Sequence, residues 1–288
     1  MSLRSNALIL ELNRVSYSYE KQKTFIHDLT FAVAEGAFIG LLGANGSGKS
    51  TIMKLGSGIL KPLSGSVSLW GKSINTLNNR DRAKLISYLP QTLDSSVPFT
   101  VRELVGMGLY PYDILPAMTV DEAMDMVGLA GKADAHLTDL SGGERRRTFI
   151  AMTLVQGAGL LLLDEPLANL DIKYQIDLVK LLRKLRESKN IAVVMALHDI
   201  NIALQFEKVM LIKNGAMLGS GAPSEVLTEG LIRDAFDVEV KIMKEPDGKA
   251  YVSYESNLSL RSDAERDFGK VSAGETDQRE KDITEIRR

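Results

Sequence analysis

Stretches in which apolar and polar side chains alternate occur at three places along the chain. They cover residues 8–19, 28–36 and 65–71, and this period of two predicts half-buried strands. Residues 160–163 and 191–197 are instead continuously apolar, which is typical of central strands in a parallel sheet, where both faces are buried. The chain is therefore expected to contain two kinds of sheet.

Helical periodicity occupies the segments between these strands. Residues 171–189 place apolar side chains on one helical face, at Ile172, Ile176, Val179 and Leu182. The pattern is also helical from about residue 94 to residue 138, with a capped amphipathic segment over residues 119–131. Strands that alternate with helices predict an α/β fold: a parallel sheet wound by right-handed crossovers, with the alternating strands as an antiparallel layer beside it.

Two hairpins and a charged segment follow the last central strand. Asn214-Gly215 predicts the first turn, and the Pro-Asp-Gly at residues 246–248 predicts the second. Residues 257–288 carry eight acidic and seven basic side chains with few apolar ones, which predicts a flexible tail. The length of the chain allows either one α/β domain with an insertion or two domains ahead of this tail.

A glycine-rich segment, GANGSGKST, begins at Gly43 and follows the apolar run AFIGLL. The spacing from Gly43 through Gly48 to Lys49 and Ser50 matches a phosphate-binding loop. Such a loop directs several backbone N–H groups at one anion, and the dipole of the following helix adds to the attraction. Lys49 would contact the β- and γ-phosphates, and Ser50 would ligate Mg²⁺. A chance turn is the alternative, but a strand before the loop and a helix after it favour the phosphate site.

Two carboxylates and a histidine stand where continuously apolar strands end. Asp164 follows four leucines, Glu165 is next to it, and His198 follows residues 191–197. An aspartate at such a strand end can hold Mg²⁺, usually through its waters, and a carboxylate one residue later can reach an attacking water. His198 stands at the carboxyl end of a parallel strand, the edge at which ligands bind such sheets. Structural roles at a strand end are the alternative.

A second glycine-containing segment, DLSGGERRR, covers residues 139–147. Ser141, Gly142 and Gly143 precede a predicted helix and form a second potential anion-binding helix start. One nucleotide does not need two such loops far apart in one chain, whereas two copies of the chain could close each other's phosphate loops. An ordinary helix N-cap is the alternative.

Composition excludes several classes of function. The chain has 288 residues, 25% of them charged, and a net charge of −2, which gives no electrostatic footprint for nucleic acid. No apolar run approaches the roughly 18 residues needed to span a bilayer. We expect no signal peptide at the N-terminus. The absence of cysteine excludes disulfides and thiol chemistry and fits the cytoplasm.

These motifs together resemble the ATP-binding subunits of ABC transporters over roughly residues 7–254. Residues 43–51 resemble Walker A, residues 160–166 Walker B and residues 140–144 the signature motif. The resemblance implies an α/β P-loop NTPase fold in an ABC ATPase domain over residues 1–256, with an antiparallel β subdomain and an inserted helical subdomain at about residues 94–145. It also implies ATP hydrolysis with Mg²⁺.

Further positions match the same family. Gln91 resembles the Q-loop glutamine, residues 168–171 the D-loop, His198 the switch histidine and Tyr19 the aromatic residue that stacks on adenine. The resemblance implies that Glu165, His198, Gln91 and Lys49 are catalytic, and that Ser50, Gln91 and Asp164 contact the metal. It implies ATP contacts at Tyr19, Gly43, Asn45, Gly46, Gly48, Lys49, Ser50, Thr51, Ser141, Gly142, Gly143 and Asp171.

The resemblance also implies partners. Two such subunits, as a homodimer or with a paired ATPase subunit, would bind ATP head to tail at the cytoplasmic face of the cell membrane. They would act on a polytopic permease docked near residues 100–112, and indirectly on a periplasmic or extracellular substrate-binding protein, without nucleic acid. Residues 100–112, 170–182, 197–204 and 219–236 are similar to importer subunits that serve iron–siderophore, haem and cobalamin uptake.

Three residues and one segment depart from the family pattern. Glu144 stands where glutamine is commoner, Arg146 where glutamine often follows, and Leu167 where threonine is usual. The segment between residues 112 and 137 is short for this subgroup. None of these changes removes a catalytic group, but the short segment bears on the transported substrate, because that region faces the permease.

Other functions within and beyond the family remain open. A soluble ABC ATPase of DNA repair would need a long coiled coil between the halves of its site, and the spacings from Lys49 to Gln91 and from Gln91 to Leu140 leave no room for one. Translation members usually carry two ATPase units in one chain. An importer subunit for vitamins, amino acids or metal ions is a further alternative. A protein that only binds nucleotide is disfavoured because Glu165 and His198 are both present.

Overall fold

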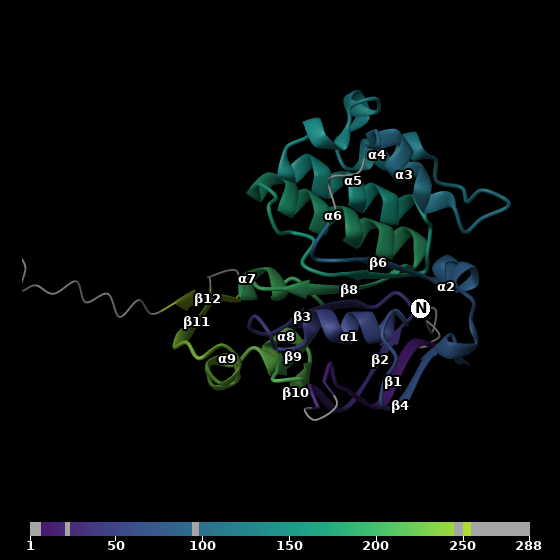
Figure 1. Cartoon of the computed structure of the whole chain (residues 1–288). Coiled ribbons are helices and arrows are strands. Elements are labelled where there is room, and N and C mark those ends of the chain that lie inside the picture. The colour runs from purple at the N-terminus through teal and green to yellow at the C-terminus, as the bar shows by residue number, and fades with distance from the viewer. Residues whose placement is uncertain (1–6, 21–23, 94–97, 245–249, 255–288) are drawn as a thin grey trace, which may run out of the picture.

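The computed structural model describes residues 7–20, 24–93, 98–244 and 250–254. The predicted tail at residues 257–288 and the predicted turn at residues 246–248 lie outside the described residues. The order of elements is strand-rich at the N-terminus, helical in the middle and mixed at the C-terminus (Figure 1).

A six-stranded sheet forms the centre of the molecule. Its order is β10-β9-β3-β8-β7-β6, with β10 antiparallel to β9 and the other described pairs parallel. The strands are β3 (Phe38–Leu42), β6 (Ile86–Leu89), β7 (Leu160–Leu163), β8 (Ala192–Leu197), β9 (Lys208–Lys213) and β10 (Ala216–Gly221). Asn214 and Gly215 both have positive φ in the β9–β10 turn, as predicted.

The alternating strands form a separate antiparallel sheet in the order β2-β1-β4-β5. Its members are β1 (Leu8–Tyr17), β2 (Ile26–Ala34), β4 (Ser64–Leu69) and β5 (Lys72–Ser73). The apolar alternation in β1 changes phase between Leu12 and Val15, where the register with β2 shifts and Arg14 has a positive φ. An irregularity of this kind returns the next apolar side chain to the buried face.

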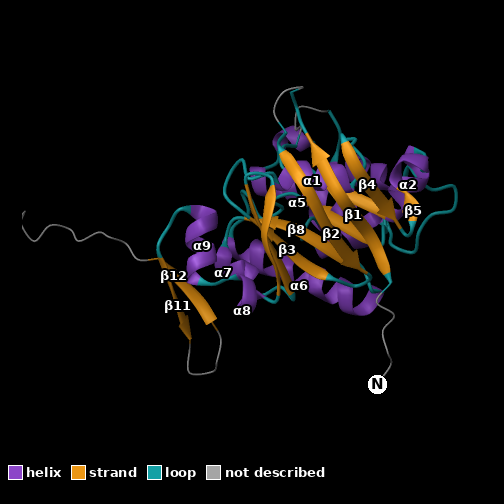
Figure 2. Cartoon of the chain, turned by 90° about the horizontal axis from the view of Figure 1, so that it is seen from below, coloured by secondary structure: helices purple, strands orange, loops and turns teal. Residues whose placement is uncertain are grey.

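Helices cover both faces of the central sheet. Helix α1 (Lys49–Gly56) lies between the central sheet and the antiparallel sheet, and the helices α3 to α6 lie on the opposite face (Figure 1); Figure 2 shows β1, β2 and β4 in front of α1. The helices α3 to α6 are α3 (Val101–Gly106), α4 (Val120–Met126), α5 (Gly142–Val155) and α6 (Ile172–Lys189). The remaining elements are α2 (Asn79–Leu85), α7 (Ile200–Ala203), α8 (Pro223–Val226), α9 (Glu229–Phe236), β11 (Val240–Lys244), β12 (Ala250–Tyr254) and 3₁₀ turns at 74–76, 107–109, 130–132 and 137–139.

The central strands divide their side chains between two cores. Leu161 and Leu163 of β7 pack with the helical side, whereas Leu160 and Leu162 pack with α1 and the antiparallel sheet. This two-sided burial explains the continuously apolar sequence of β7. It also fixes the carboxyl end of β7, and therefore Asp164, at the edge of the sheet near the start of α1.

The predicted apolar face of α6 is only half buried. Val179 and Leu182 belong to the core, but Ile172 is 75% exposed and Ile176 is 48% exposed. Of the four side chains predicted to share this face, only the two from Val179 onward are buried. Helical periodicity identifies side chains that share a face, but how far the covering layer extends depends on tertiary packing.

Candidate functional site

The phosphate-type loop joins β3 to α1 in a conformation that requires glycine. A Cβ at Gly43 would lie 2.3 Å from the carbonyl oxygen of Ile212, so the backbone approach at this point excludes a side chain. Gly48 is the N-cap of α1 and has φ +112, which side chains rarely adopt. The loop therefore keeps bare backbone at the start of a helix, as phosphate binding requires.

A cavity of about 320 Å³ lies over this loop. It is lined by Phe25, Asn45, Gly46, Ser47, Gly48, Lys49, Ser50, Thr51, Gln91, Glu165 and His198. The structure thus brings together predicted site residues from four separate parts of the chain: the phosphate-type loop, Gln91, Glu165 and His198. Phe25 is a lining residue that the sequence patterns do not predict; it is an aromatic residue directly before β2, and this is the signal that could identify it.

Lys49 is held against the loop that precedes it. Its Nζ donates to the carbonyl oxygens of Gly43 at 2.7 Å and Ala44 at 3.1 Å. Burial lowers the pKa of Lys49, and the charges of Glu165 and Asp164 act in the opposite direction. The loop carbonyls thus hold the ammonium at the cavity.

Asp164 is buried, stands next to Glu165 of the cavity lining, and has one carboxylate oxygen without a hydrogen-bond partner. Its Oδ2 accepts from the Tyr88 hydroxyl at 3.4 Å, the Ser50 side chain also hydrogen-bonds to the carboxylate, and Oδ1 is buried without a partner. Burial raises the pKa of Asp164. An unpartnered carboxylate oxygen beside a hydroxyl fits Mg²⁺, which binds through one or two carboxylates together with substrate phosphates and water. In the described part of the chain, no group of three or more His, Cys, Asp or Glu side chains is placed to hold a metal ion.

Glu165 is the centre of a hydrogen-bonded cluster. Gln91 donates from Nε2 to Glu165 Oε2 at 2.7 Å, and His198 Nε2 lies 2.5 Å from Glu165 Oε1. Glu165 also has a positive φ of 51°, a conformation that costs about 1–3 kcal/mol for a non-glycine residue. The structure therefore joins three of the predicted catalytic residues at the carboxyl edge of the sheet, with a buried and strained Glu165 between the exposed side chains of Gln91 and His198.

Tyr19 lies at the margin of this site. It is 59% exposed, its ring stands edge-on to Tyr17, and its hydroxyl lies 2.8 Å from Thr51 Oγ1. The contact with Thr51 ties Tyr19 to α1 directly after the phosphate-type loop. Tyr19 is thus open to a ligand beside the phosphate-type loop.

The second glycine-containing segment lies away from the cavity. Ser141 is the N-cap of α5 and forms a capping box with Glu144, and Glu144 also pairs with Lys132 at 2.6 Å. Lys132 and the Ser141 bonds lower the pKa of Glu144 to about 2. Glutamate in place of glutamine thus stabilises the start of α5.

Gly142, Gly143 and Asp171 are the remaining residues predicted to contact ATP; the two glycines follow Ser141 directly in the chain. A Cβ at Gly142 would meet open space, and a Cβ at Gly143 would lie 3.3 Å from the carbonyl oxygen of Asn169, two residues before Asp171. Asp171 is the N-cap of α6, without a side-chain capping bond. Ser141, Gly142, Gly143 and Asp171 do not line the cavity over the phosphate-type loop, so one chain does not assemble all the predicted ATP contacts.

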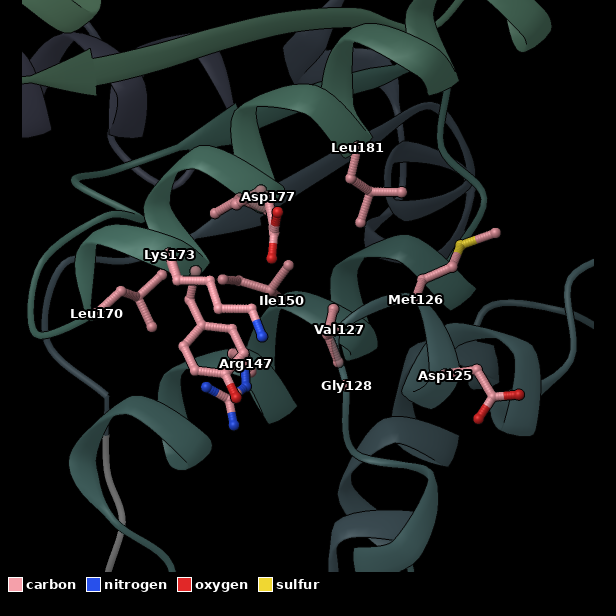
Figure 3. Close-up of a pocket in the computed structure, with 12 residues that line it drawn as sticks. Asp125, Met126, Val127, Gly128, Arg147, Ile150, Leu170, Lys173, Asp177 and Leu181 are labelled. Carbon is pink, nitrogen blue, oxygen red and sulfur yellow. The ribbon is translucent and has the colours of Figure 1, made fainter.

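A second cavity, of about 350 Å³, lies between α4, α5 and α6. Figure 3 shows Leu170, Lys173 and Arg147 on one side of it and Met126 and Asp125 on the other. The Arg147 guanidinium lies 3.7 Å from the ring centre of Tyr174, a cation–π contact that joins α5 to α6. Among the described helices, none combines the length and apolar character that a membrane span requires.

Comparison with known proteins identifies the family. Residues 26–168 match the family model described as ABC transporter. A petrobactin import ATP-binding protein from Bacillus anthracis is 36% identical over 244 residues, which cover 82% of this chain and 89% of that protein. The chain belongs to the ABC transporter ATP-binding proteins. A hemin import ATP-binding protein from Rhodopseudomonas palustris is 39% identical over 240 residues, which cover 80% of this ABC protein and 91% of its relative.

A solved structure supports the same conclusion. A dimeric ATP-binding cassette in a post-hydrolysis state, bound to ADP and Pi, has a TM-score of 0.67 at 26% identity, and the match covers 75% of this ABC protein and 99% of that chain. The predicted family and the predicted α/β P-loop fold are confirmed. The chain is an ATP-hydrolysing ABC protein, and the two relatives named above are ATP-binding proteins of import systems.

Proposed function

We propose that two copies of this chain, or one copy and a paired ATPase subunit, bind two ATP molecules head to tail and drive transport through a membrane permease. The observation that carries the proposal is the cluster of Gln91, Glu165 and His198 at the cavity of the phosphate-type loop. A carboxylate with two ordered partners beside a phosphate site can orient and polarise an attacking water.

Each residue of the site has a distinct role in this proposal. The loop amides and Lys49 hold the phosphates, Glu165 polarises the water, and His198 stabilises the charge that develops on the phosphate. Mg²⁺, when bound, would be held by Ser50 and Asp164 with Gln91 as a further contact, and it would neutralise phosphate charge. Tyr19 would stack its ring on adenine.

The partner chain would complete each site. Ser141, Gly142, Gly143 and Asp171 are available for a nucleotide bound to the other chain because they do not line the cavity of their own. The start of the 14-residue helix α5, with open space at Gly142, suits the γ-phosphate of that nucleotide. In a symmetric dimer, each chain contributes its phosphate-type loop to one ATP site and its Ser141 segment to the other.

An apolar groove on the helical side is the proposed docking surface for the permease. It is lined by Phe99, Glu103, Gly106, Met107, Leu109 and Tyr110, and Tyr110 is 85% exposed. Ile114 and Leu115, a few residues further on, are also exposed. An exposed apolar surface of this kind marks an interaction site. Docking there would place the chain at the cytoplasmic face of the membrane.

We further propose an iron chelate, haem or cobalamin as the transported substrate, delivered to the permease by a substrate-binding protein. The relatives named for petrobactin and hemin import support this class, together with the similarity of residues 100–112 and 219–236 to that subgroup. An importer subunit for another substrate class and a soluble ABC ATPase of DNA repair or translation are the alternatives.

Permease stimulation tests the proposed coupling. The purified chain should hydrolyse ATP slowly, and its rate per chain should rise with protein concentration, because only ATP holds two copies together. A permease holds two copies close and raises their effective concentration, so its addition should raise the rate. Stimulation by DNA or ribosomes in place of a permease would overturn the importer assignment and leave the ATPase assignment intact.

Tyr110→Asp should abolish the permease-dependent rise, because a carboxylate buried against the permease would be unpaired. The melting temperature should not change, since Tyr110 is exposed in the free chain. Tyr251→Asp, an exposed tyrosine on β12, is the matched control and should leave stimulation intact. A Tyr110→Asp chain with full stimulation would exclude this groove as the docking surface.

A further inference from the structure

Arg146 on α5 lies outside the cavity but next to its catalytic residues. The residue is 5% exposed and stands five positions after Ser141. Its neighbour Arg147 turns toward α6 and the second cavity (Figure 3), whereas Arg146 turns toward the ends of β6 and β7. Two adjacent arginines of one helix thus have different environments.

The Arg146 guanidinium donates to backbone carbonyl oxygens of the catalytic segments. Nη2 donates to Asp164 at 2.8 Å and to Glu165 at 2.5 Å, and Nη1 donates to Gln91 at 2.8 Å. Longer bonds of 3.4 Å run from Nε to Pro166 and from Nη1 to Pro90. Three of these five acceptors belong to the residues whose side chains face the metal and the attacking water in the proposed site.

A guanidinium suits this position for a geometric reason. It is planar and carries five N–H donors in a fixed fork, so it fixes several acceptors relative to one another. Burial lowers the pKa of Arg146, and the charges of Asp164 and Glu165 oppose that shift. The group stays charged, because an arginine guanidinium is effectively always protonated in proteins.

The backbone that Arg146 holds is strained. Glu165 has φ +51, in the left-handed region that costs energy for a residue with a Cβ. The short bond to the Glu165 carbonyl, together with the bond to the preceding Asp164 carbonyl, stabilises this turn. Without these donors, the strand end could relax, and the Glu165 carboxylate would move away from Gln91 and His198.

We propose that Arg146 is a positioning residue for ATP hydrolysis, which holds the backbone of Gln91, Asp164 and Glu165 in the hydrolytic arrangement and ties it to α5. This inference rests on the proposed roles of Gln91 and Glu165. It gives a function to the arginine that stands where glutamine is frequent in the family. It also links the catalytic residues of one site to the helix whose start would contact the nucleotide of the other site.

Two substitutions test the proposal in the full chain. Arg146→Met keeps an unbranched side chain and removes every donor, whereas Arg146→Gln keeps one amide with two donors. We expect Arg146→Met to lower kcat by about 10- to 100-fold and Arg146→Gln to lower it less, with KM and directly measured ATP affinity changed by no more than about threefold. ATP affinity is retained because neither variant alters Lys49 or its loop.

A remote arginine supplies the matched control. Arg183 on α6 also donates to a backbone carbonyl, that of Gln205 at 2.9 Å. Arg183→Met makes the same change in charge and should leave kcat unchanged. A second readout is non-additivity: in a Glu165→Gln background, Arg146→Met should reduce the residual rate far less than it does in the wild-type background, because both act on the same carboxylate.

An unchanged kcat in a folded Arg146→Met chain, or a loss of ATP affinity as large as the loss of kcat, would overturn the proposal. If thermal melting shows that Arg146→Met does not fold, the same two measurements on Arg146→Gln decide. Glu165→Gln separates this inference from the proposed function. Wild-type turnover in Glu165→Gln refutes the role of Glu165, whereas an inactive Glu165→Gln beside a fully active Arg146→Met refutes only the role of Arg146.

Discussion

Replacement of Glu165 by glutamine is expected to lower ATP turnover by about 10²- to 10⁴-fold while ATP still binds. The amide keeps the shape of the side chain but cannot accept a proton from water. It also places an NH₂ group where one of the two carboxylate oxygens lies beside Gln91 Nε2 or His198 Nε2. Because Lys49 and its loop are unchanged, the ATP-bound dimer should accumulate, which gel filtration with ATP detects.

The control for this variant is a glutamate of the same charge at the surface. Glu207 pairs with Arg186 at 2.6 Å and is half exposed, so Glu207→Gln should leave turnover intact. A Glu165→Gln chain that hydrolyses ATP at the wild-type rate would remove Glu165 from its proposed role. Loss of ATP binding in the same variant would show that the substitution disturbs the phosphate-type loop.

Asp164→Asn should have opposite effects on activity and on stability. Hydrolysis should fall by about 100-fold or more, because an amide oxygen is a poorer ligand for Mg²⁺ than a carboxylate. The nucleotide-free protein should nevertheless be at least as stable as the wild type at neutral pH. Asp164 is 1% exposed with Oδ1 unpartnered, so its charge is costly until a cation is bound.

The effect of Asp164→Asn on stability should depend on pH in a defined direction. Burial raises the pKa of Asp164 in the folded chain above its value in the unfolded chain. The ionised form therefore destabilises the fold as the pH rises, and no such cost exists below the ordinary carboxyl range of about pH 4. The stability gained by Asp164→Asn, measured by thermal melting without nucleotide, should shrink as the pH is lowered.

Asp28→Asn is the control for Asp164→Asn. Asp28 is an exposed aspartate paired with Arg14, and its substitution should change neither turnover nor the pH dependence of melting. A strongly destabilised Asp164→Asn chain at neutral pH would show that the carboxylate is needed for folding. It would contradict the interpretation that the unpartnered carboxylate serves to bind a cation.

Local sequence patterns predict most of the fold and most of the residues that one chain brings together at the cavity. The four leucines of β7 are apolar because they face two cores in alternation, so the strand and the place of Asp164 after it follow from the sequence. Gly43 and Gly48 are glycines because the backbone conformation excludes a side chain, and this requirement is visible as a motif. Strong local constraints of this kind leave a sequence signature.

Features that depend on distant contacts left no such signature. The five carbonyl partners of Arg146 come from segments about 20 and 55 residues away in sequence. The departure from glutamine marks Arg146 as unusual, but the run of three arginines does not show which groups it contacts. Leu109, in the segment expected to dock the permease, packs partly against the core, while Tyr110 next to it is exposed. A difference of one position therefore decides which side chain is exposed to a partner, and the helical pattern alone does not predict that position.

The central claim, that each ATP is hydrolysed between two chains, is tested most directly by mixing two inactive variants. Lys49→Ala removes the phosphate contact of its own chain, and Ser141→Arg blocks the contact that its chain offers to the partner. In a head-to-tail dimer of the two variants, one site carries both defects and the other carries neither.

We predict that each variant alone is inactive and that an equimolar mixture recovers about a quarter of the wild-type rate, as expected for random pairing and independent sites. The measurement is steady-state ATP turnover at a protein concentration that supports dimerisation. A Ser141→Arg chain with wild-type activity on its own, or a mixture as inactive as its components, would contradict the account.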